Sequence, residues 1–409
     1  MKILIVTQNF PPDIGGASIR LSGYAKYLNE FGHKVTVLCS NPIYPRGKIF
    51  EGYTNKWFQK EEKDGYTIIR TWIWPVKPKS HAILRILSYC SFTVSACIRS
   101  LKLEKPDIII SATPSFFASL ISIFYKKLKN VKIILDITDV WPDAALATGF
   151  MKKNLFFWLA KKIELWIYRD VDNLTCGSIG IKRELLKNQW LENKITIIPD
   201  AADLELFPLN LNSDSVIKEY NLENKFIVGF AGLLGFAQQP TIIAHVAKKL
   251  EPYQDIKFLI VGTGGLKNDF ENLAKEWKLN NIIFAGEKPR NIIANYINAF
   301  DVGLSTLANK DFLRNSVPAK IFEYLACGLP IVINLKSVAW DIVNEAKAGV
   351  LANEDDATDL ANKILYLYNH KSEALKMGEN GRAYALENYD RKKIVEKLEK
   401  VIVATLNTH

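Results

Sequence analysis

The chain has 409 residues, with 48% apolar and 23% charged side chains, a composition that excludes a disordered or low-complexity protein. This length exceeds one ordinary hydrophobic core and predicts two domains of about 200 residues each. The net charge is +10, and the five cysteines form no CxxC pair and have no nearby histidine, so the sequence indicates neither a disulfide framework nor a zinc site and favours the reducing cytoplasm.

The first part of the chain has the pattern of strands and helices alternating around a parallel sheet. The apolar run 2–7 is too short for a signal peptide and predicts a strand buried on both faces, and residues 18–31 predict a helix. Between them lies a loop with Gly15 and Gly16, where backbone can approach a ligand closely. This loop is not a GxGxxG motif, and ordinary turns also use glycine. Further strands are expected at 34–39, 108–111, 132–136 and 173–176.

Residues 66–105 mix basic and aromatic side chains and contain a single acid, Glu104. The bases are Arg70, Lys77, Lys79, Arg85, Arg99, Lys102 and Lys105, and the aromatics among them are Trp72, Trp74, Tyr89 and Phe92. This mixture suits an anionic membrane surface, although a nucleic-acid face would look similar. The plainer alternative is a solvated basic helix with its aromatics in the core. We expect peripheral contact with an anionic membrane through 66–105, and no nucleic-acid partner.

The next segment, 108–125, carries no charge over 18 residues, near the lower limit for a membrane span. Pro114 and five hydroxyl residues, including Ser115, divide it into a strand, a loop and an amphipathic helix. We therefore expect a strand–helix unit here and no membrane span.

Three acids, Asp136, Asp139 and Asp143, follow the strand predicted at 132–136. The carboxyl ends of parallel strands are where such sheets place their sites. Asp139 or Asp143 is able to orient or deprotonate an acceptor hydroxyl, but Asp143 is better suited to capping the helix after Pro142. Asp139 is therefore the candidate catalytic carboxylate.

No metal or cofactor is expected. Asp170 and Asp172 resemble a metal-binding DxD motif, but they lie at a helix end just before a strand, which indicates capping and solvation. No GxGxxG motif follows a strand, so a dinucleotide cofactor is not indicated.

The second part of the chain repeats the strand–loop–helix pattern, with glycines after several predicted strands. Strands are expected at 226–230, 257–261, 281–284, 301–305 and 331–334. The pattern predicts an α/β protein with two Rossmann-like, doubly wound domains facing a cleft. We expect the first domain at 1–208, the second at 209–388, and a C-terminal helix at 389–409 that packs back on the first.

The stretch 314–330 has the features of an anion site. Ser316 is a possible helix cap before Pro318, and Gly328 ends the helix. The free amides and positive dipole end of such a helix favour an anion. Lys320 and Glu323 are three residues apart and share one face, so they suit a nucleoside diphosphate, with Lys320 for phosphate and Glu323 for ribose. A surface Lys–Glu pair on a capped helix is the alternative.

Short motifs in a specific order span nearly the whole chain. They are Pro11-Pro12 with Gly15-Gly16, Gly32-His33, Ile198-Pro199 to Phe207, Gly262-Thr263-Gly264, Gly286-Glu287, Asp301-Val302, and Glu323 to Pro330. Together they resemble the GT-B glycosyltransferases, specifically the retaining family 4. Residues 139–143 and 316–320 further resemble the branch that builds bacterial surface polysaccharides, including transferases of N-acetylated amino sugars such as L-fucosamine.

The resemblance implies that a nucleotide binds the second domain. It implies Glu323 on the ribose, the amides of Ser316 and Val317 near the diphosphate, and the Gly286 loop beside the base. The other implied donor contacts are Gly15 and Gly16 from the first domain, and Arg314, Asn315, Gly232, Gly264, Glu287 and Lys288.

Three positions depart from the family pattern. Asn315 stands where many members have a glutamate that touches the donor sugar. Residues 233–239 lack the usual arginine and lysine, which leaves Lys320 and Arg314 to neutralise phosphate. Thr138 stands where a histidine often precedes the aspartate. These departures affect the diphosphate contacts and the identity of the donor.

The resulting hypothesis is metal-independent, retaining transfer of an N-acetylated amino sugar from a UDP-sugar to a lipid-linked or saccharide acceptor, with Lys320 and Asp139 as catalytic residues. The protein would work in synthesis of a surface polysaccharide, such as O-antigen or capsule, at the inner face of the cell membrane. A sugar-nucleotide epimerase or hydrolase on the same fold would instead consume donor without acceptor. A non-catalytic basic membrane binder would bind in a salt-dependent way without turnover.

Overall fold

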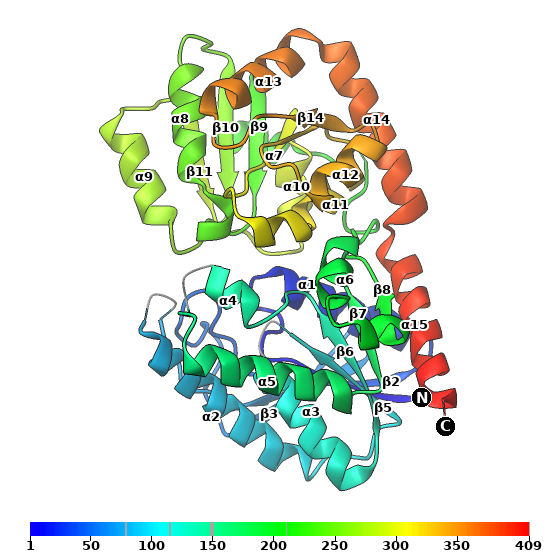
Figure 1. Ribbon diagram of the computed structural model, residues 1–409. Coiled ribbons are helices and arrows are strands. Elements are labelled where there is room, and N and C mark those ends of the chain that lie inside the picture. Colours follow the sequence, from blue (N-terminus) through cyan, green and yellow to red (C-terminus); the bar gives the residue numbers. More distant parts are fainter. Residues whose placement is uncertain (78–79, 114–115, 148–150, 210, 409) are drawn as a thin grey trace. The chain divides into compact units, whose positions relative to one another are not determined.

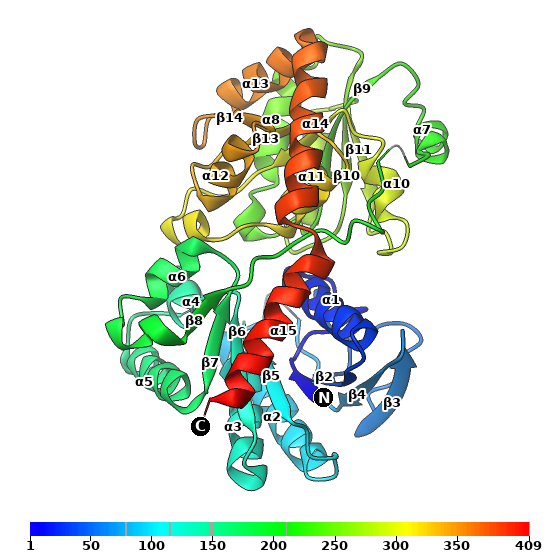
Figure 2. The ribbon, with the colours of Figure 1, turned by 90° about the vertical axis from the view of Figure 1, so that its right-hand side faces the viewer.

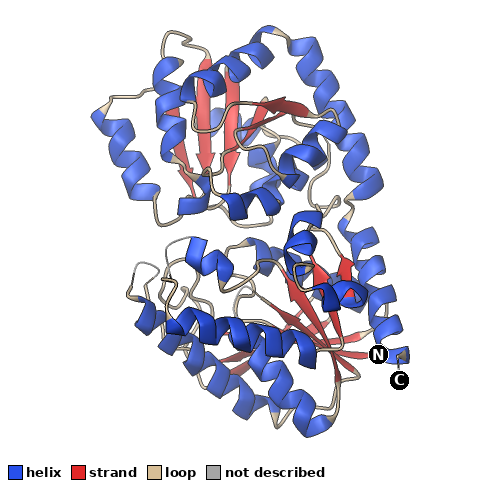
Figure 3. Ribbon diagram, in the orientation of Figure 1, coloured by secondary structure: helices blue, strands red, loops and turns tan. Residues whose placement is uncertain are grey.

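A computed structural model describes residues 1–409 except 78–79, 114–115, 148–150, 210 and 409 (Figure 1). The chain divides into two compact units: Met1–Pro199 with Lys392–His409 forms unit 1, and Asp200–Arg391 forms unit 2. Each unit has its own parallel sheet with helices on both sides (Figure 3). The prediction of two doubly wound α/β domains is therefore confirmed.

Unit 1 contains an eight-stranded sheet in the order β3-β4-β2-β1-β5-β6-β7-β8, parallel except for the β3–β4 pair. Its strands are β1 (Lys2–Val6), β2 (Lys34–Ser40), β3 (Phe58–Lys63), β4 (Tyr66–Thr71), β5 (Ile108–Ala112), β6 (Lys132–Ile137), β7 (Asn173–Cys176) and β8 (Ile195–Ile197). Its helices are α1 (Gly16–Glu30), α2 (Ala82–Ser100), α3 (Phe116–Lys129), α4 (Asp143–Ala147), α5 (Leu155–Asp170), α6 (Ile179–Leu185) and α15 (Arg391–Asn407).

The helices of unit 1 cover both faces of this sheet because successive strand residues point to opposite faces. Leu4 and Val6 of β1 belong to the core cluster that includes Phe92 of α2 and Ile167 of α5. The helices α1 and α15 lie over the other face (Figure 2). Continuous apolar strands are what such two-sided burial requires.

The β3–β4 hairpin was not predicted, although Asp64-Gly65 lies at its turn. Both residues have positive φ, 48° and 82°. An Asp-Gly pair between two candidate strands is a strong indication of a hairpin. The short edge strand β14 (Gly349–Leu351) of unit 2 was not predicted either.

The uncharged segment 108–125 forms β5 and the start of α3, as predicted, while Pro114 and Ser115 lie outside the described residues. Within the part of the chain that the structure describes, no helix is long and apolar enough to cross a membrane.

Unit 2 contains a six-stranded parallel sheet in the order β11-β10-β9-β12-β13-β14. Its strands are β9 (Phe226–Ala231), β10 (Ile256–Val261), β11 (Ile282–Gly286), β12 (Val302–Ser305), β13 (Ile331–Ile333) and β14 (Gly349–Leu351). Its helices are α7 (Asp214–Glu219), α8 (Thr241–Lys249), α9 (Lys267–Glu276), α10 (Ile293–Ile297), α11 (Ala319–Ala326), α12 (Val338–Glu345), α13 (Ala357–Asn369) and α14 (Lys371–Asn388).

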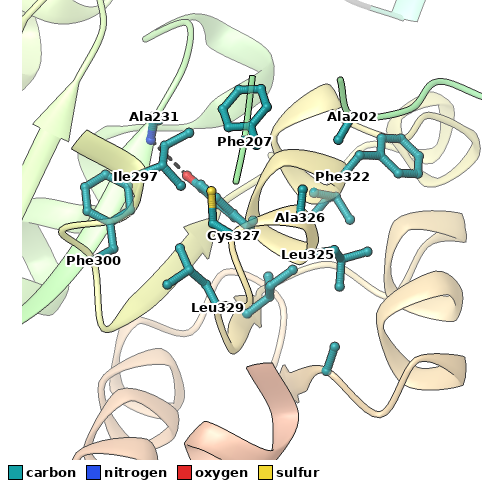
Figure 4. Close-up of a cluster of buried hydrophobic side chains, with 14 of the residues drawn as sticks. Ala202, Phe207, Ala231, Ile297, Phe300, Phe322, Leu325, Ala326, Cys327 and Leu329 are labelled. Atoms are coloured by element: carbon teal, nitrogen blue, oxygen red, sulfur yellow. Dashed lines mark hydrogen bonds between the residues drawn. The ribbon is translucent and has the colours of Figure 1, made fainter. Parts of the chain in front are cut away.

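The buried helix α11 lies at the centre of one core cluster of unit 2 (Figure 4). Phe322, Leu325 and Ala326 pack there beside Phe207 and Phe300. The hydroxyl of Tyr324 accepts a hydrogen bond of 2.9 Å from the backbone N–H of Ala231, the last residue of β9. These contacts fix α11 against the carboxyl end of the sheet.

The prediction that Ser316 caps this helix was wrong. The N-cap residue is Pro318, in an extended conformation and without a side-chain cap, and Ser316 instead ends the short 3-10 helix Asp311–Asn315. Proline has a fixed φ that suits the residue next to a helix start, and this preference sets the boundary two residues later than a serine cap would.

Candidate functional site

Three glycine loops at the carboxyl edge of the unit 2 sheet are joined through their backbones. The N–H of Gly232 donates to Val261 O at 2.9 Å, and the N–H of Gly262 donates to Gly286 O at 2.8 Å. Gly262 has a φ of +150°, and a Cβ there would lie 1.8 Å from Gly232 O. Only glycine fits this approach, so the loops after β9, β10 and β11 form one connected edge.

This packing predicts that Gly262→Ala destabilises unit 2 by roughly 2–4 kcal/mol, because a backbone carbonyl would have to move. Gly286→Ala is the matched control: its φ is +72° but no atom lies within 4 Å of the added Cβ. We expect it to cost only about 1–2 kcal/mol, from the backbone conformation. Urea unfolding of both variants measures the difference, and equal costs would contradict the clash.

Lys320 lies beside this edge and is deeply buried. Lys320 is 7% exposed, and its Nζ lies 3.3 Å from the centre of the Phe230 ring. Among the described residues this nitrogen has no hydrogen-bond partner. A Cβ at Gly232 would lie 3.2 Å from Lys320 Cε, so glycine leaves room for the lysine. Burial lowers the pKa of Lys320 to about 7, and Glu323 opposes this shift. A buried cation without a hydrogen-bond acceptor is a group prepared for an anion.

Glu323, one helical turn further on, is 6% exposed and paired with Arg290. Its Oε1 accepts a hydrogen bond from Arg290 Nη1 at 2.5 Å, and the guanidinium carbon lies 4.8 Å from the centre of the Phe207 ring. Arg290 was not predicted as a site residue. In the sequence, Arg290 is only a basic residue in the segment 286–290 after β11. The structure adds that it contacts Glu323, the residue predicted to bind ribose.

The structure brings Gly232, Lys320 and Glu323 together but directs Arg314 elsewhere. The two terminal nitrogens of Arg314 donate to the two carboxylate oxygens of Glu354 at 2.6 and 2.8 Å. To contact a phosphate, Arg314 would have to leave Glu354 or bind both groups at once. The expected role of Arg314 stays a prediction.

The other predicted donor contacts of unit 2 lie in the loops after β10 and β11 and in the segment before α11. Lys288 Nζ lies 4.7 Å from the centre of the Tyr296 ring, and a hydrogen bond with Tyr296 raises its pKa above the ordinary value. Glu287 precedes it in the loop after β11. Asn315, Ser316 and Val317 lead into α11, and a Cβ at Gly264 would lie 2.5 Å from Leu234 O. Their roles stay predictions.

In unit 1, Gly15 and Gly16 stand at the N-terminus of α1, directly after the loop that follows β1. A Cβ at Gly15 would lie 3.5 Å from a ring carbon of Tyr44, while one at Gly16 would meet no atom within 4 Å. Asp13 holds this loop, because its Oδ1 accepts hydrogen bonds from the N–H groups of Ile43 at 2.8 Å and Tyr44 at 2.6 Å. Gly16 therefore borders open space at the carboxyl edge of this sheet.

The three acids after β6 have different surroundings. Asp136 forms an ion pair with Arg20 at 2.8 Å and Asp143 forms one with Lys161 at 2.5 Å, whereas Asp139 forms none with the residues described. Burial raises the pKa of Asp139, and its charge acts on the Tyr44 hydroxyl. Of the three, Asp139 is the one left available for a hydroxyl.

Arg85 and Tyr89 of α2 belong to the same neighbourhood and were not predicted as site residues. Burial is the main cause that raises the pKa of Tyr44, and the charges of Tyr89, Arg85 and Asp139 also act on it. Arg85 Nη2 donates to the Tyr89 hydroxyl at 3.3 Å. A cation and two phenols beside Asp139 suit a polar acceptor.

Asp172 of the DxD-like pair has a structural role, because its Oδ2 accepts hydrogen bonds of 2.8 Å from Lys126 Nζ and from the N–H of Ile133. Across the described residues, no group of three or more His, Cys, Asp or Glu side chains is arranged to hold a metal ion.

Several of the basic and aromatic residues of 66–105 are buried or paired within unit 1. Arg70 is buried and paired with Glu61, the Arg99 guanidinium lies 4.3 Å from the centre of the Phe58 ring, and Phe92 is fully buried. Lys79 lies outside the described residues. The exposed positions of α2 carry aliphatic side chains instead.

Comparisons with known proteins agree with this architecture. The E. coli K12 protein named "Putative colanic acid biosynthesis glycosyl transferase WcaI" is 25% identical over 345 residues, which cover 82% of this chain and 84% of that protein. Sucrose-phosphate synthase from Thermosynechococcus elongatus superposes with a TM-score of 0.76 at 15% identity, covering 98% of both chains. Anabaena HepE in complex with UDP-glucose gives a TM-score of 0.74 at 16% identity, covering 99% of this chain and 100% of that one.

Two family models match consecutive parts of the chain. Residues 14–206 match "Glycosyltransferase Family 4" and residues 212–384 match "Glycosyl transferases group 1". Since these two matches together span most of both units and the fold agrees with solved structures of such enzymes, this chain belongs to the family 4, or group 1, glycosyltransferases and has the GT-B fold.

Proposed function

We propose that this protein transfers a sugar, with retention of configuration, from a UDP-sugar to a hydroxyl of a lipid-linked or saccharide acceptor. The name of WcaI refers to colanic acid biosynthesis, and HepE was solved with UDP-glucose, which supports a UDP-sugar donor and a surface-polysaccharide product. We further propose an N-acetylated amino sugar as the donor sugar, no metal ion or cofactor, and a location at the inner face of the cell membrane.

One observation carries this proposal: the buried Lys320 ammonium has no hydrogen-bond acceptor in the part of the chain that the structure describes, and it lies three residues before the buried Glu323. A diphosphate would supply the missing acceptor and neutralise the charge. Ribose hydroxyls would donate to Glu323, which a carboxylate accepts well. The ribose hydroxyls would then replace the hydrogen bond that Arg290 donates to Glu323, or bind Glu323 together with Arg290.

The chemical step breaks the bond between the anomeric carbon and the diphosphate oxygen, whose electron pair leaves with the diphosphate. The acceptor oxygen forms the new bond to the anomeric carbon. Charge develops on that leaving group while the sugar gains oxocarbenium character, so donors prepared in advance lower the barrier. Lys320 and the first amides of α11, both on unit 2, would stabilise that charge. Asp139 of unit 1 would orient the acceptor hydroxyl and accept its proton, and its raised pKa makes it a stronger base than an ordinary aspartate.

Thermal stabilisation by UDP tests the nucleotide site. At 100 times its dissociation constant, UDP should add about 2.7 kcal/mol to the free energy of unfolding, and GDP, ADP and NAD should add less at the same concentration. Glu323→Ala should remove most of this effect, because hydrogen bonds to a charged group contribute about 1.5–3 kcal/mol.

The control is Leu375→Ala on α14, an exposed position away from the glycine loops, which should keep the UDP response. Stabilisation by GDP but not UDP would change the proposed donor class. An unchanged UDP response in Glu323→Ala would remove Glu323 from the site. Donor consumption without an acceptor would favour a hydrolase or epimerase instead.

A further inference from the structure

The helices that cover one face of the unit 1 sheet expose apolar side chains to solvent. We define the outer apolar face as the large apolar side chains of α2, α3 and α5 that are 38–73% exposed. They are Ile83, Ile86, Leu87, Val94 and Ile98 of α2, Phe124 and Leu128 of α3, and Leu155, Phe156, Trp158, Leu159 and Trp166 of α5. A helix on a sheet ordinarily turns polar residues outward, so this face needs an explanation.

These side chains form one surface. On α2, Ile83, Leu87, Val94 and Ile98 follow helical spacing and make a single stripe. The opposite side of α2, with Ser88 and Phe92, is buried in the unit. The helix α3 packs against both α2 and α5, which places their outward sides next to one another (Figure 1). Side chains scattered singly would be unremarkable, but a continuous face marks an interaction.

The three helices that form this surface contain almost no acidic residues. The sequences of α2 and α3 contain no Asp or Glu, and α5 contains only Glu164, which is buried, and Asp170 at its last position. Exposed lysines border the apolar side chains, namely Lys127, Lys152, Lys153 and Lys162. The surface is therefore apolar and positive.

Two of these lysines lie against tryptophan rings. Lys127 Nζ is 5.2 Å from the centre of the Trp166 ring, and Lys153 Nζ is 5.6 Å from the centre of the Trp158 ring. Tryptophan and lysine side by side suit the boundary between lipid headgroups and acyl chains. A second copy of the chain fits less well, because a two-fold pairing through this face would bring its lysines together.

We propose that the outer apolar face docks on an anionic lipid bilayer, with its aliphatic and aromatic side chains below the headgroups and its lysines among them. This inference rests on the proposed function, since a lipid-linked acceptor requires the protein at a bilayer, and it assigns the contact to outward apolar side chains. The residues 66–105 then contribute through the aliphatic stripe of α2, and the lysines named above come from α3, from α5 and from the residues just before α5.

Vesicle sedimentation of the full chain tests this. Wild type should bind vesicles of phosphatidylcholine with phosphatidylglycerol more strongly than phosphatidylcholine alone, and salt should weaken the binding. Leu155→Ser with Phe156→Ser, and separately Ile83→Ser with Val94→Ser, should each lower the partition coefficient about tenfold or more, because each loses two buried apolar side chains. Lys152→Gln with Lys153→Gln should weaken binding to the anionic vesicles only.

The matched control is Leu375→Ser with Leu386→Ser on α14, where Leu375 is 70% exposed and Leu155 is 71% exposed. It should bind like wild type. The inference is overturned if wild type fails to bind anionic vesicles, or if both unit 1 pairs bind them as strongly as wild type does. A dimer in solution that these pairs dissociate would overturn it too, in favour of a second copy.

Thermal stabilisation by UDP without vesicles separates this inference from the proposed function. All the variants should keep it, which also shows that they fold. Vesicle binding without any UDP response would refute the transferase proposal and leave the bilayer contact standing. The reverse result would refute only the bilayer contact.

Discussion

Lys320→Met is expected to make the protein more stable and a much poorer enzyme. Removing one charge stabiliser of the leaving diphosphate should lower kcat roughly 100-fold or more. The same change removes the free-energy cost of burying a cation beside Phe230. Melting temperature and transfer rate, measured on the same preparation, should therefore move in opposite directions.

The pH dependence of stability tests the origin of this effect. The pKa of Lys320 is about 7 in the folded protein and 10.5 in the ordinary state, so the folded form binds the proton less tightly. The cost to folding, on the order of a few kcal/mol, is complete below pH 7 and declines as pH rises towards 10.5. Wild type should gain stability across this window relative to Lys320→Met.

The same titration affects ligand binding. A bound diphosphate favours the charged ammonium, so UDP binding should take up a proton and weaken as pH rises above about 7. Lys320→Met should lack this pH dependence. A variant with the wild-type transfer rate would show that Lys320 is not the stabiliser, and a lower melting temperature at pH 7 would show that its burial is not costly.

Asp136→Ala is expected to destabilise unit 1 by about 3–5 kcal/mol, because it leaves the Arg20 guanidinium buried without its carboxylate. Both side chains are at most 2% exposed. Asp136 accepts from Arg20 Nε at 2.8 Å and Nη2 at 2.9 Å, and from the Thr175 hydroxyl at 2.7 Å. Urea unfolding should show the loss.

The double variant Arg20→Met with Asp136→Ala is the control, since it removes both charges. It should recover a large part of the stability, and a double variant as unstable as Asp136→Ala would argue against an unpaired charge as the cause. Arg20 lies on α1, so the pair also fixes Gly16 relative to β6. UDP stabilisation should persist at temperatures where the variant is folded, because Lys320 and Glu323 belong to unit 2.

Local pattern was enough to predict most strands and the face shared by Lys320 and Glu323. The spacing of three residues places two side chains on one side of any helix, whatever surrounds it. The glycine loops after β9 and β10 were also predicted from local sequence, because glycine allows close backbone approach. The helix start was misplaced by two residues because Ser316 and Pro318 both suit a helix terminus, and local sequence does not rank them.

Other features depend on contacts between residues far apart in the sequence. Arg290 and Glu323 are 33 residues apart and meet only because the β11 loop passes α11. The burial of Lys320 depends on Phe230, which belongs to β9. A lysine on a short helix has the same local sequence whether it is exposed or enclosed, so its lowered pKa was not predictable.

In the helix α2, some properties follow from composition and others from packing within unit 1. Composition determined that this helix is apolar, aromatic and basic, and it suggested a bilayer contact through the bases. The tertiary structure turned Arg85 and Arg99 towards partners within unit 1 and left the aliphatic stripe outward. Periodicity fixes which residues share a side of a helix, but only the packing of that helix against its sheet decides which side faces the core.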